Sequence, residues 1–293
     1  MRILLLGTDT PLGQALARCV VGLGRHELVP MSRSACRWKS ERQAKKSVRR
    51  ADCDIVVDLR IESAADGSEA IHELDLKRCH WVSKACQRSG IAYLYVSSSR
   101  IFSGKLDRPY DEEDQPDSEE TVGELLANAE EAVRATCERH LILRLGLVFS
   151  ETGPNLITEM LGQIMAGGSL VLDNNLRGCP VAADDGARVV SAILDQLGTG
   201  LEAWGTYHYC SSDTATYYEF AEALLASASQ FSEFSSSAVE LQEQSQGHPR
   251  LNRSLDCSKL RNTFAIKQIP WRSAIADIVK QYFAELKQRE VPE

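Results

Sequence analysis

The sequence has no apolar run long enough to cross a lipid bilayer. Met1 and Arg2 lead straight into a short apolar segment, without the pattern of a secretory signal peptide. None of the nine cysteines forms a Cys-x-x-Cys pair, so neither a disulfide framework nor a zinc site is indicated. We therefore expect reduced thiols, no metal site, no membrane contact and a cytoplasmic location.

An excess of positive charge is also missing. The formal net charge of −8 argues against general nucleic-acid binding, which depends on neutralising phosphates. The charge is unevenly spread, because residues 33–50 carry eight basic side chains against the single Glu41, whereas residues 107–131 are densely acidic. Solvated helix faces explain most of these charges. The alternative is a phosphate-binding edge in the basic segment and a protein contact surface in the acidic one.

Residues 2–13 form the clearest motif, an apolar run that leads into a glycine-containing turn and the start of a helix. Thr10 is expected to cap this helix, with Pro11 as its first residue. Such a turn aims backbone N–H groups at a phosphate, so it is a candidate dinucleotide site. The candidate cofactor-binding residues of the turn are Gly7, Thr10, Leu12 and Gly13. The alternative is a strand and a capped helix that bind nothing.

Apolar runs alternate with amphipathic segments over most of the chain. We expect strands at residues 2–6, 28–31, 54–58, 92–96, 141–145 and 205–209. We expect helices at residues 14–21, 39–50, 68–88, 119–139, 155–165, 184–197, 215–228 and 271–287, and a serine-rich loop at 227–237. This alternation predicts an α/β fold with a doubly wound parallel sheet. The predicted domains are a dinucleotide-binding domain of residues 1–147 and roughly 181–212, and a smaller C-terminal α/β lobe of residues 148–180 and 213–293.

Ligands of such sheets lie at the carboxyl ends of the strands. The expected strand ends are Gly7, Ser32, Asp58, Ser97–Ser99 and Gly146. Where NAD enzymes place an acidic residue on the ribose, this chain has Ser32 and Arg33, and an arginine there suits the 2′-phosphate of NADP. The alternative is that Ser32 and Arg33 form a plain surface loop.

Five segments, taken in order, resemble the dTDP-4-dehydrorhamnose reductase family of extended short-chain dehydrogenases. They are residues 96–104, 143–149, 173–180, 205–208 and 252–260. The resemblance implies a Rossmann domain that holds NADP(H) and a C-terminal lobe that holds a nucleotide sugar. It places Ser98 at the family's catalytic Ser/Thr position and marks Arg177 and Asn252 as candidate substrate-binding residues.

The residues that carry the family's proton transfer are missing. The family uses a Tyr as proton donor and a Lys four residues later, and these positions hold Val122 and Leu126. No tyrosine lies between Asp111 and Leu141, so shifting the alignment supplies none. The middle glycine of the turn is Thr10, whose side chain is expected to crowd a pyrophosphate.

Further departures lie at the cofactor. The family's Asn-Ala-Ala after the third strand has become three further candidate cofactor-binding residues, Asp58, Leu59 and Arg60. Another family Asn falls on Asp75. Tyr93 and Tyr95 are the candidates for a substitute acid. We expect them on alternate faces of their strand, where packing is the commoner role.

These departures favour a non-catalytic or weakly catalytic member that binds a nucleotide or nucleotide sugar, or that regulates a partner. The regulatory beta subunit of methionine adenosyltransferase resembles the same family and is a precedent for regulation. The alternative is an NADPH-dependent reductase of a 4-keto nucleotide sugar with a substituted general acid. The acidic residues 107–120 are expected to face outward and to contact a basic partner, such as residues 37–50 of a second copy in a homodimer.

Overall fold

The computed structural model describes residues 1–61, 71–153, 155–231, 239–244 and 250–290, with side chains up to residue 287. The expected helix start at residue 68 and most of the expected serine-rich loop, residues 232–237, lie outside the described residues. No helix in the described part of the chain is long and apolar enough to span a membrane.

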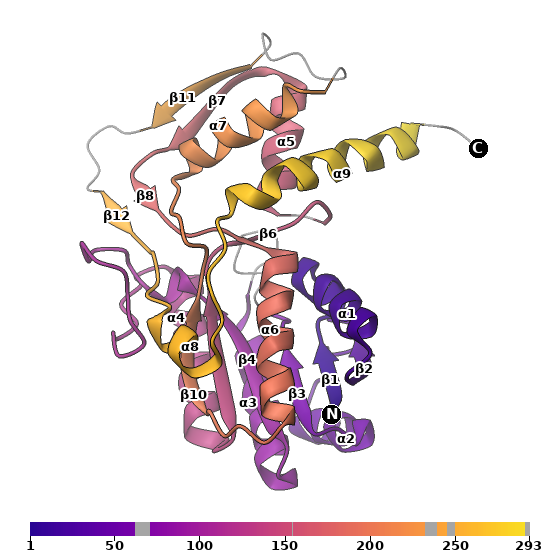
Figure 1. Ribbon diagram of the computed structural model, residues 1–293. Coiled ribbons are helices and arrows are strands. Elements are labelled where there is room, and N and C mark those ends of the chain that lie inside the picture. Colours follow the sequence, from indigo (N-terminus) through magenta and orange to yellow (C-terminus); the bar gives the residue numbers. More distant parts are fainter. Residues whose placement is uncertain (62–70, 154, 232–238, 245–249, 291–293) are drawn as a thin grey trace.

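Six parallel strands form the central sheet, in the order β10-β5-β4-β3-β1-β2 (Figure 1). Their bounds are β1 (Arg2–Leu6), β2 (Glu27–Met31), β3 (Ile55–Asp58), β4 (Ala92–Ser98), β5 (His140–Leu145) and β10 (Gly205–Tyr209). Each lies where an apolar run predicted a strand. The strand order reverses between β1 and β3, which opens a crevice at their carboxyl ends. The predicted doubly wound parallel sheet is therefore confirmed.

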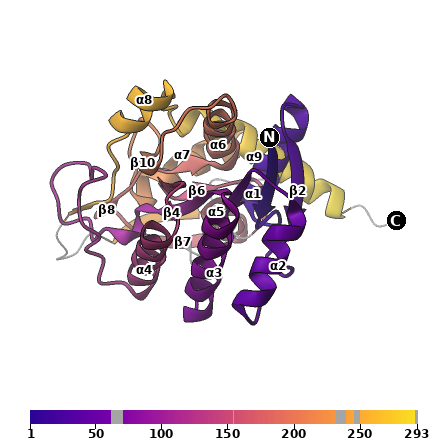
Figure 2. The same cartoon turned by 90° about the horizontal axis from the view of Figure 1, so that it is seen from below.

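Helices cover both faces of this sheet. Their bounds are α1 (Pro11–Leu23), α2 (Glu41–Ala51), α3 (Glu73–Ser89), α4 (Thr121–Thr136) and α6 (Ala183–Gly198). α1 packs on α6, whereas α2, α3 and α4 lie side by side on the opposite face (Figure 2). Because both faces are covered, every residue of β3 and β4 is buried.

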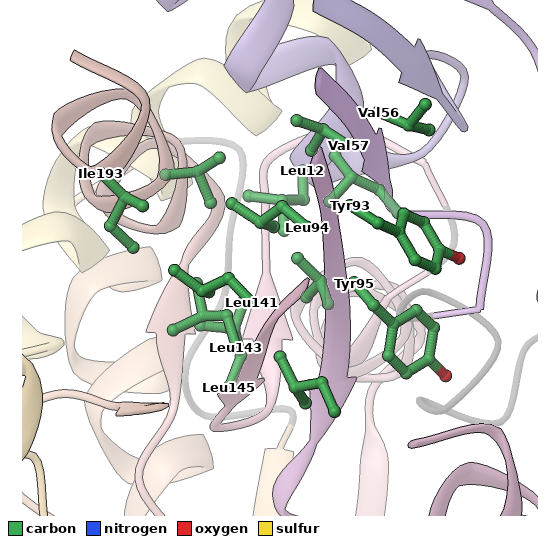
Figure 3. Packing of buried hydrophobic residues seen from close by; sticks show 14 of the residues in the cluster. Leu12, Val56, Val57, Tyr93, Leu94, Tyr95, Leu141, Leu143, Leu145 and Ile193 are labelled. Carbon is green, nitrogen blue, oxygen red and sulfur yellow. The ribbon is translucent and has the colours of Figure 1, made fainter. Parts of the chain in front are cut away.

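The two faces of the sheet are filled differently. Figure 3 shows the leucines of β5, among them Leu141, on the same side as Leu12 of α1 and Ile193 of α6. Tyr93 and Tyr95 of β4 both point to the other side, with ring centroids 6.3 Å apart. The expectation that they occupy alternate faces is wrong, because side chains two residues apart in a strand share a face.

The smaller lobe has its own apolar core, seen in the upper part of Figure 1. Its elements are α5 (Leu156–Ala166), α7 (Tyr217–Ala228), α9 (Arg272–Glu290) and a parallel pair of strands, β7 (Gly168–Asp173) and β11 (Val239–Gln244). Phe220 contacts both Phe149 and Trp271 at its centre. The three helices were expected from the sequence, and the two strands were not.

Short elements join the two parts. They are the parallel pairs β6 (Val148–Phe149) with β9 (Val181–Ala182) and β8 (Leu176–Arg177) with β12 (Leu251–Asn252), and the helix α8 (Ser258–Phe264). α8 packs on β10, and its Leu260 and Phe264 belong to the core of the large sheet. The division into two domains at the bounds given above stays a prediction.

Candidate functional site

The turn after β1 requires glycine at two positions. Gly7 has φ +90°, a backbone conformation that side chains rarely adopt. A Cβ on Gly13 would lie 2.0 Å from the Gly7 carbonyl oxygen, so α1 approaches β1 more closely than a side chain allows. Thr10 is the N-cap of α1 and Pro11 its first residue, as predicted. The close approach places the helix N-terminus, with its positive potential, directly above the strand end.

The side chain of Thr10 is fully buried. Its Oγ1 donates to the Gly7 carbonyl oxygen at 2.9 Å and accepts the Gly13 N–H at 2.9 Å. The hydroxyl therefore closes the turn from within. The expectation that this side chain crowds a pyrophosphate is wrong, because the N-cap geometry directs it back onto the first helical turn.

A cavity of about 590 Å³ opens beside the carboxyl ends of β2 and β3. We call it the arginine cavity, after the four arginines that line it, Arg33, Arg37, Arg60 and Arg78. The Asp9 carboxylate fixes Arg33 by accepting its backbone N–H at 2.7 Å and its Nε–H at 3.2 Å. Ser32 lies in the same turn, with its hydroxyl 2.9 Å from that of Ser34. Three of the four guanidinium groups are already paired with carboxylates, Arg33 with Asp9, Arg60 with Asp58 and Arg78 with Asp75, and Asp75 itself lines the cavity.

At the edge of the arginine cavity, Arg60 is tied to Asp58. Arg60 Nε donates to Asp58 Oδ1 at 2.8 Å and Nη2 donates to Oδ2 at 2.6 Å. The Tyr93 hydroxyl donates to the same Oδ2 at 2.7 Å. Leu59 supplies only backbone to the turn, its carbonyl carbon lying 3.0 Å from the position of a Cβ on Gly7. The two charges that replace the family's Asn and Ala thus neutralise each other.

Tyr93 and Tyr95 are fully buried in the core of the sheet. Burial, with the nearby negative charge of Asp58, raises the pKa of Tyr93 well above its usual value. Burial raises the pKa of Tyr95 in the same direction. Neither tyrosine belongs to the lining of the arginine cavity or the cleft cavity as the described residues define them, so their position supports the packing role and not the substitute-acid role.

A second cavity, of about 210 Å³, lies between the sheet and the smaller lobe, and we call it the cleft cavity. Ser98, at the end of β4, lines it together with Ser99 and Arg100 of the short η2 turn (Ser99–Ile101). The segment between β8 and β9 contributes Cys179, and the start of α7 contributes Tyr217. Ser98 therefore occupies the expected place, with its Oγ accepting the Arg100 N–H at 3.3 Å.

Val122 and Leu126 stand on the first turns of α4. Leu126 is fully buried in the core of the large sheet. Val122 is half-buried and packs against the same core. Both side chains are absent from the lining of the cleft cavity given by the described residues. Both side chains therefore contribute to the apolar packing of α4 against the core of the large sheet.

Three charged residues meet at the wall of the cleft cavity. Arg100 donates to Glu120 Oε2 from Nη2 at 2.7 Å, and Arg253 donates to Glu120 Oε1. Burial alone would raise the pKa of Glu120, but the hydrogen bonds from Arg253 and Arg100 outweigh it and lower the pKa. Sequence reasoning missed all three. The position of Arg100, directly after the Ser97–Ser99 strand end, was the one signal that pointed to this wall.

The acidic segment does not face outward as a whole, because Glu120 lines the cleft cavity. Most of the other acids of the segment also have partners within the chain. They are Glu112 with the His208 N–H, Asp114 with Arg108, Asp117 with Ser103 and Glu119 with Lys105. Asp107, Glu113, Asp117 and Glu119 are exposed. The outward expectation therefore holds for these four residues and fails for Glu120, and a homodimer stays a prediction.

The two candidate substrate-binding residues lie on the β8–β12 pair. Arg177 donates to Thr214 Oγ1 at 3.0 Å and to Glu219 Oε1 at 2.6 Å. Asn252 Oδ1 accepts the Ser254 N–H at 3.0 Å. Neither belongs to the lining of the cleft cavity given by the described residues, whereas their neighbours Gly178 and Arg253 do. Their binding role is thus not supported by position.

Within the described ranges, no group of His, Cys, Asp and Glu side chains is arranged to hold a metal ion. The polar groups at the strand ends instead line two sites, the arginine cavity and the cleft cavity. The candidate cofactor-binding residues of the turn, Gly7, Thr10, Leu12 and Gly13, belong to the lining of neither cavity as the described residues define it.

Comparison with known proteins shows similarity to dTDP-4-dehydrorhamnose reductases in both sequence and structure. The dTDP-4-dehydrorhamnose reductase of Sinorhizobium fredii is 26% identical over 245 residues, covering 80% of this chain and 82% of the relative. A solved dTDP-4-dehydrorhamnose reductase of Clostridium acetobutylicum has a TM-score of 0.80 at 19% identity and covers 98% of this chain and 100% of its own. That of Bacillus anthracis, in complex with NADP, has a TM-score of 0.76 at 17% identity and covers 97% and 98%.

At these identities the solved structures establish a shared fold. The model of the family described as RmlD substrate binding domain matches residues 1–284, nearly the whole chain. The resemblance drawn from the five sequence segments is thereby confirmed. The chain belongs to the RmlD substrate binding domain family.

Proposed function

We propose that this chain binds a nucleotide sugar through its diphosphate in the cleft cavity and does not reduce it. The observation that carries this proposal is the aliphatic pair Val122 and Leu126 on α4, with Leu126 fully buried. A positioned general acid supplies about 10²–10⁴-fold of a rate, and neither side chain can donate a proton. The cleft cavity, in contrast, still presents charged side chains that can bind an anionic ligand.

The charges at the cleft cavity favour an anionic ligand. Arg100 and Arg253 carry two positive charges there against the single negative charge of Glu120. A diphosphate offers several acceptors for guanidinium groups. The similarity to enzymes named for a dTDP sugar supports a nucleotide sugar over other anions. The acidic segment does not oppose such a ligand, since Glu120 is already neutralised.

The proposed cofactor is NADP(H), if the chain binds one. The turn at Gly7 and Gly13 has the close approach that dinucleotide sites require, and Arg33 lines the arginine cavity. The solved Bacillus anthracis neighbour contains NADP. A cofactor held without a proton donor would act as a structural or regulatory ligand.

Two measurements on the full chain test the proposal. Calorimetric titration with a thymidine diphosphate sugar should give saturable binding, which Arg253→Met weakens. An assay of NADPH oxidation with dTDP-4-dehydrorhamnose should give no turnover approaching ~10 s⁻¹, the median for enzymes. Absence of binding would overturn the first half of the proposal, and turnover at that rate would overturn the second.

The second candidate function is an NADPH-dependent reductase of a 4-keto nucleotide sugar with a substituted acid. One observation favours it, because the phenol of Tyr217 lines the cleft cavity from the start of α7. Any reductase activity should then be lost in Tyr217→Phe while sugar binding persists. Equal turnover in Tyr217→Phe and the unchanged chain would exclude Tyr217 as the acid.

A further inference from the structure

Three cysteine thiols meet around one carbonyl oxygen beside the cleft cavity. Cys210 Sγ lies 3.4 Å from the Leu255 carbonyl oxygen and 3.8 Å from Cys257 Sγ. Cys257 Sγ lies 3.7 Å from the same oxygen. The Cys179 thiol is close enough to the Cys210 thiol and to the Leu255 backbone for both to influence its pKa. Cys210 is therefore the thiol that neighbours both of the others.

The three cysteines also sit where the chain passes between the sheet and the smaller lobe. Cys179 lies between β8 and β9, Cys210 directly follows β10, and Cys257 directly precedes α8. The segments that contain Gly146, Cys179 and Cys210 pack tightly against one another. A Cβ on Gly146 would lie 1.8 Å from the Cys179 carbonyl oxygen and 3.2 Å from Cys210 Cβ. A bond between any two of these sulfurs would link two of these chain segments covalently and restrict movement of the cavity wall.

Cys179 lines the cleft cavity, whereas Cys210 and Cys257 are absent from the lining given by the described residues. Hydrogen bonding from the Cys210 thiol lowers the pKa of Cys179 despite its burial. The same contacts with Cys179 and Cys257, together with burial, raise the pKa of Cys210. The thiolate is the reactive form of cysteine, so the thiol at the cavity wall is the one prepared to react.

We propose that Cys179, Cys210 and Cys257 form a thiol relay that converts a peroxide in the cleft cavity into a disulfide between Cys210 and Cys257. This proposal does not depend on which ligand the cavity binds. The site is distinct from the charged wall formed by Arg100, Glu120 and Arg253, and it needs no metal ion.

The chemistry proceeds in three balanced steps. The Cys179 thiolate attacks one oxygen of hydrogen peroxide, the O–O bond breaks, and the product is a sulfenic acid and hydroxide, which takes up a proton to become water. Cys210 then attacks the sulfenic sulfur, the S–O bond breaks, and a second water leaves with the thiol proton. Finally Cys257 loses its proton and its thiolate attacks the Cys210 sulfur, the Cys179–Cys210 bond breaks, and Cys179 leaves as a thiolate that takes up the proton lost by Cys257.

In sum, two thiols lose two electrons and one peroxide is reduced to two waters. A disulfide has an S–S length near 2.0 Å, so the sulfurs of Cys210 and Cys257 must approach by roughly 1.8 Å from their 3.8 Å separation. Side-chain rotation covers a movement of this size. The final bond joins the end of β10 to the start of α8 and leaves Cys179 reduced.

The test uses the reduced full chain, treated with hydrogen peroxide, alkylated and mapped by mass spectrometry. The expected product is a Cys210–Cys257 disulfide. Cys179→Ser should slow its formation by roughly tenfold or more, because the raised pKa of Cys210 leaves little thiolate to react with peroxide directly. Cys257→Ser should trap a Cys179–Cys210 disulfide, and Cys210→Ser should leave a sulfenic acid on Cys179 that dimedone labels.

Cys137→Ser is the matched control. Cys137 is also buried, burial raises its pKa to about 11, and it ends α4 on the far side of the sheet from α8. This variant should form the disulfide at the unchanged rate. Formation of the bond in Cys179→Ser at that same rate would overturn the relay, as would the absence of any linkage among the three cysteines. The order of labelling in the unchanged chain gives the same answer without a variant, because Cys179 must be oxidised first.

Discussion

The guanidinium of Arg60 and the carboxylate of Asp58 form a two-point ion pair inside the protein, although the residues are only two positions apart. Their side chains are 6% and 0% exposed, and the Tyr93 hydroxyl donates a further hydrogen bond to Asp58. The pair stands at the end of β3, next to the turn that holds Gly7. The charges contribute little to cofactor binding while they are paired in this way, and their main effect is on stability.

Arg60→Ala should lower the free energy of unfolding by about 3–5 kcal/mol, because it leaves the Asp58 carboxylate buried and unpaired. The double variant Asp58→Asn/Arg60→Ala should regain a large part of this loss. A neutral Asn avoids the buried charge and still accepts the Tyr93 hydroxyl. Urea unfolding of the unchanged chain and the two variants measures these free energies. A double variant as unstable as Arg60→Ala would show that the loss does not come from the unpaired Asp58 carboxylate.

Gly13→Ala should destabilise the chain severely, because the new methyl group would lie 2.0 Å from the Gly7 carbonyl oxygen. Gly22→Ala, in the same helix, is the matched control. A Cβ there meets no atom within 4 Å, so the variant should gain roughly 0.5–1 kcal/mol from the lower flexibility of the unfolded chain. Thermal unfolding of both variants measures the contrast. Equal effects at the two positions would show that α1 does not approach β1 as closely as described.

Glu120→Gln should strengthen the binding of a nucleoside diphosphate in the cleft cavity. The change removes the negative charge that now lies between Arg100 and Arg253 and frees their donors. A gain of about 1 kcal/mol, or roughly fivefold in affinity, is expected for one charge near a partly exposed site. Titration at low and high salt checks it, because the gain should shrink as salt screens the charges. Weaker binding by Glu120→Gln would indicate that the carboxylate itself contacts the ligand.

The large sheet was predictable, and the cleft wall was not, for physical reasons. Buried parallel strands such as β3 and β4 are continuous apolar runs, which a sequence displays directly. β7 and β11 are half-exposed and lie far apart in the chain, so neither has a clear pattern of its own. The Glu120–Arg253 contact joins residues 133 positions apart, and only the folded chain brings them together.

Thr10 and the acidic segment illustrate a further limit. The residue types were recognised, but the direction of the side chains was not contained in the pattern. Thr10 turns inward because its hydroxyl satisfies the Gly13 N–H. Glu120 turns toward the cleft cavity because two arginines lie there, although its side chain stays 40% exposed. Such directions depend on the positions of partners, which periodicity does not specify.

Arg33→Ala should reduce any preference for NADP(H) over NAD(H). Arg33 lines the arginine cavity at the end of β2, and its Asp9 contacts hold the guanidinium there. Calorimetric titration with both cofactors measures the preference before and after the change. Arg18→Ala is a control, since Arg18 lies on α1 and pairs with Asp184. Equal affinities in the unchanged chain, or an unaltered preference in Arg33→Ala, would remove Arg33 from the site.

Stability should fall as the pH is lowered below about 6.5, and His208 should account for part of this fall. His208 is fully buried, Nδ1 lies 3.1 Å from the Tyr110 carbonyl oxygen, and Nε2 lies 3.2 Å from Arg144 Nη1. Burial and the positive charge of Arg144 lower its pKa to about 3. Between that value and the ordinary 6.5, the unfolded chain binds a proton that the folded chain does not.

The unfolded state is therefore favoured by about 1.4 kcal/mol more at pH 5.5 than at pH 7.5 through this residue alone. Burial raises the pKa of Glu112, whose carboxylate accepts the backbone N–H of His208, and this acts in the opposite direction. The measurement is thus the difference in slope between the unchanged chain and His208→Gln, which does not titrate. Urea unfolding across this range should give a shallower pH dependence for His208→Gln. Identical slopes would mean that His208 is accessible to protons in the folded chain.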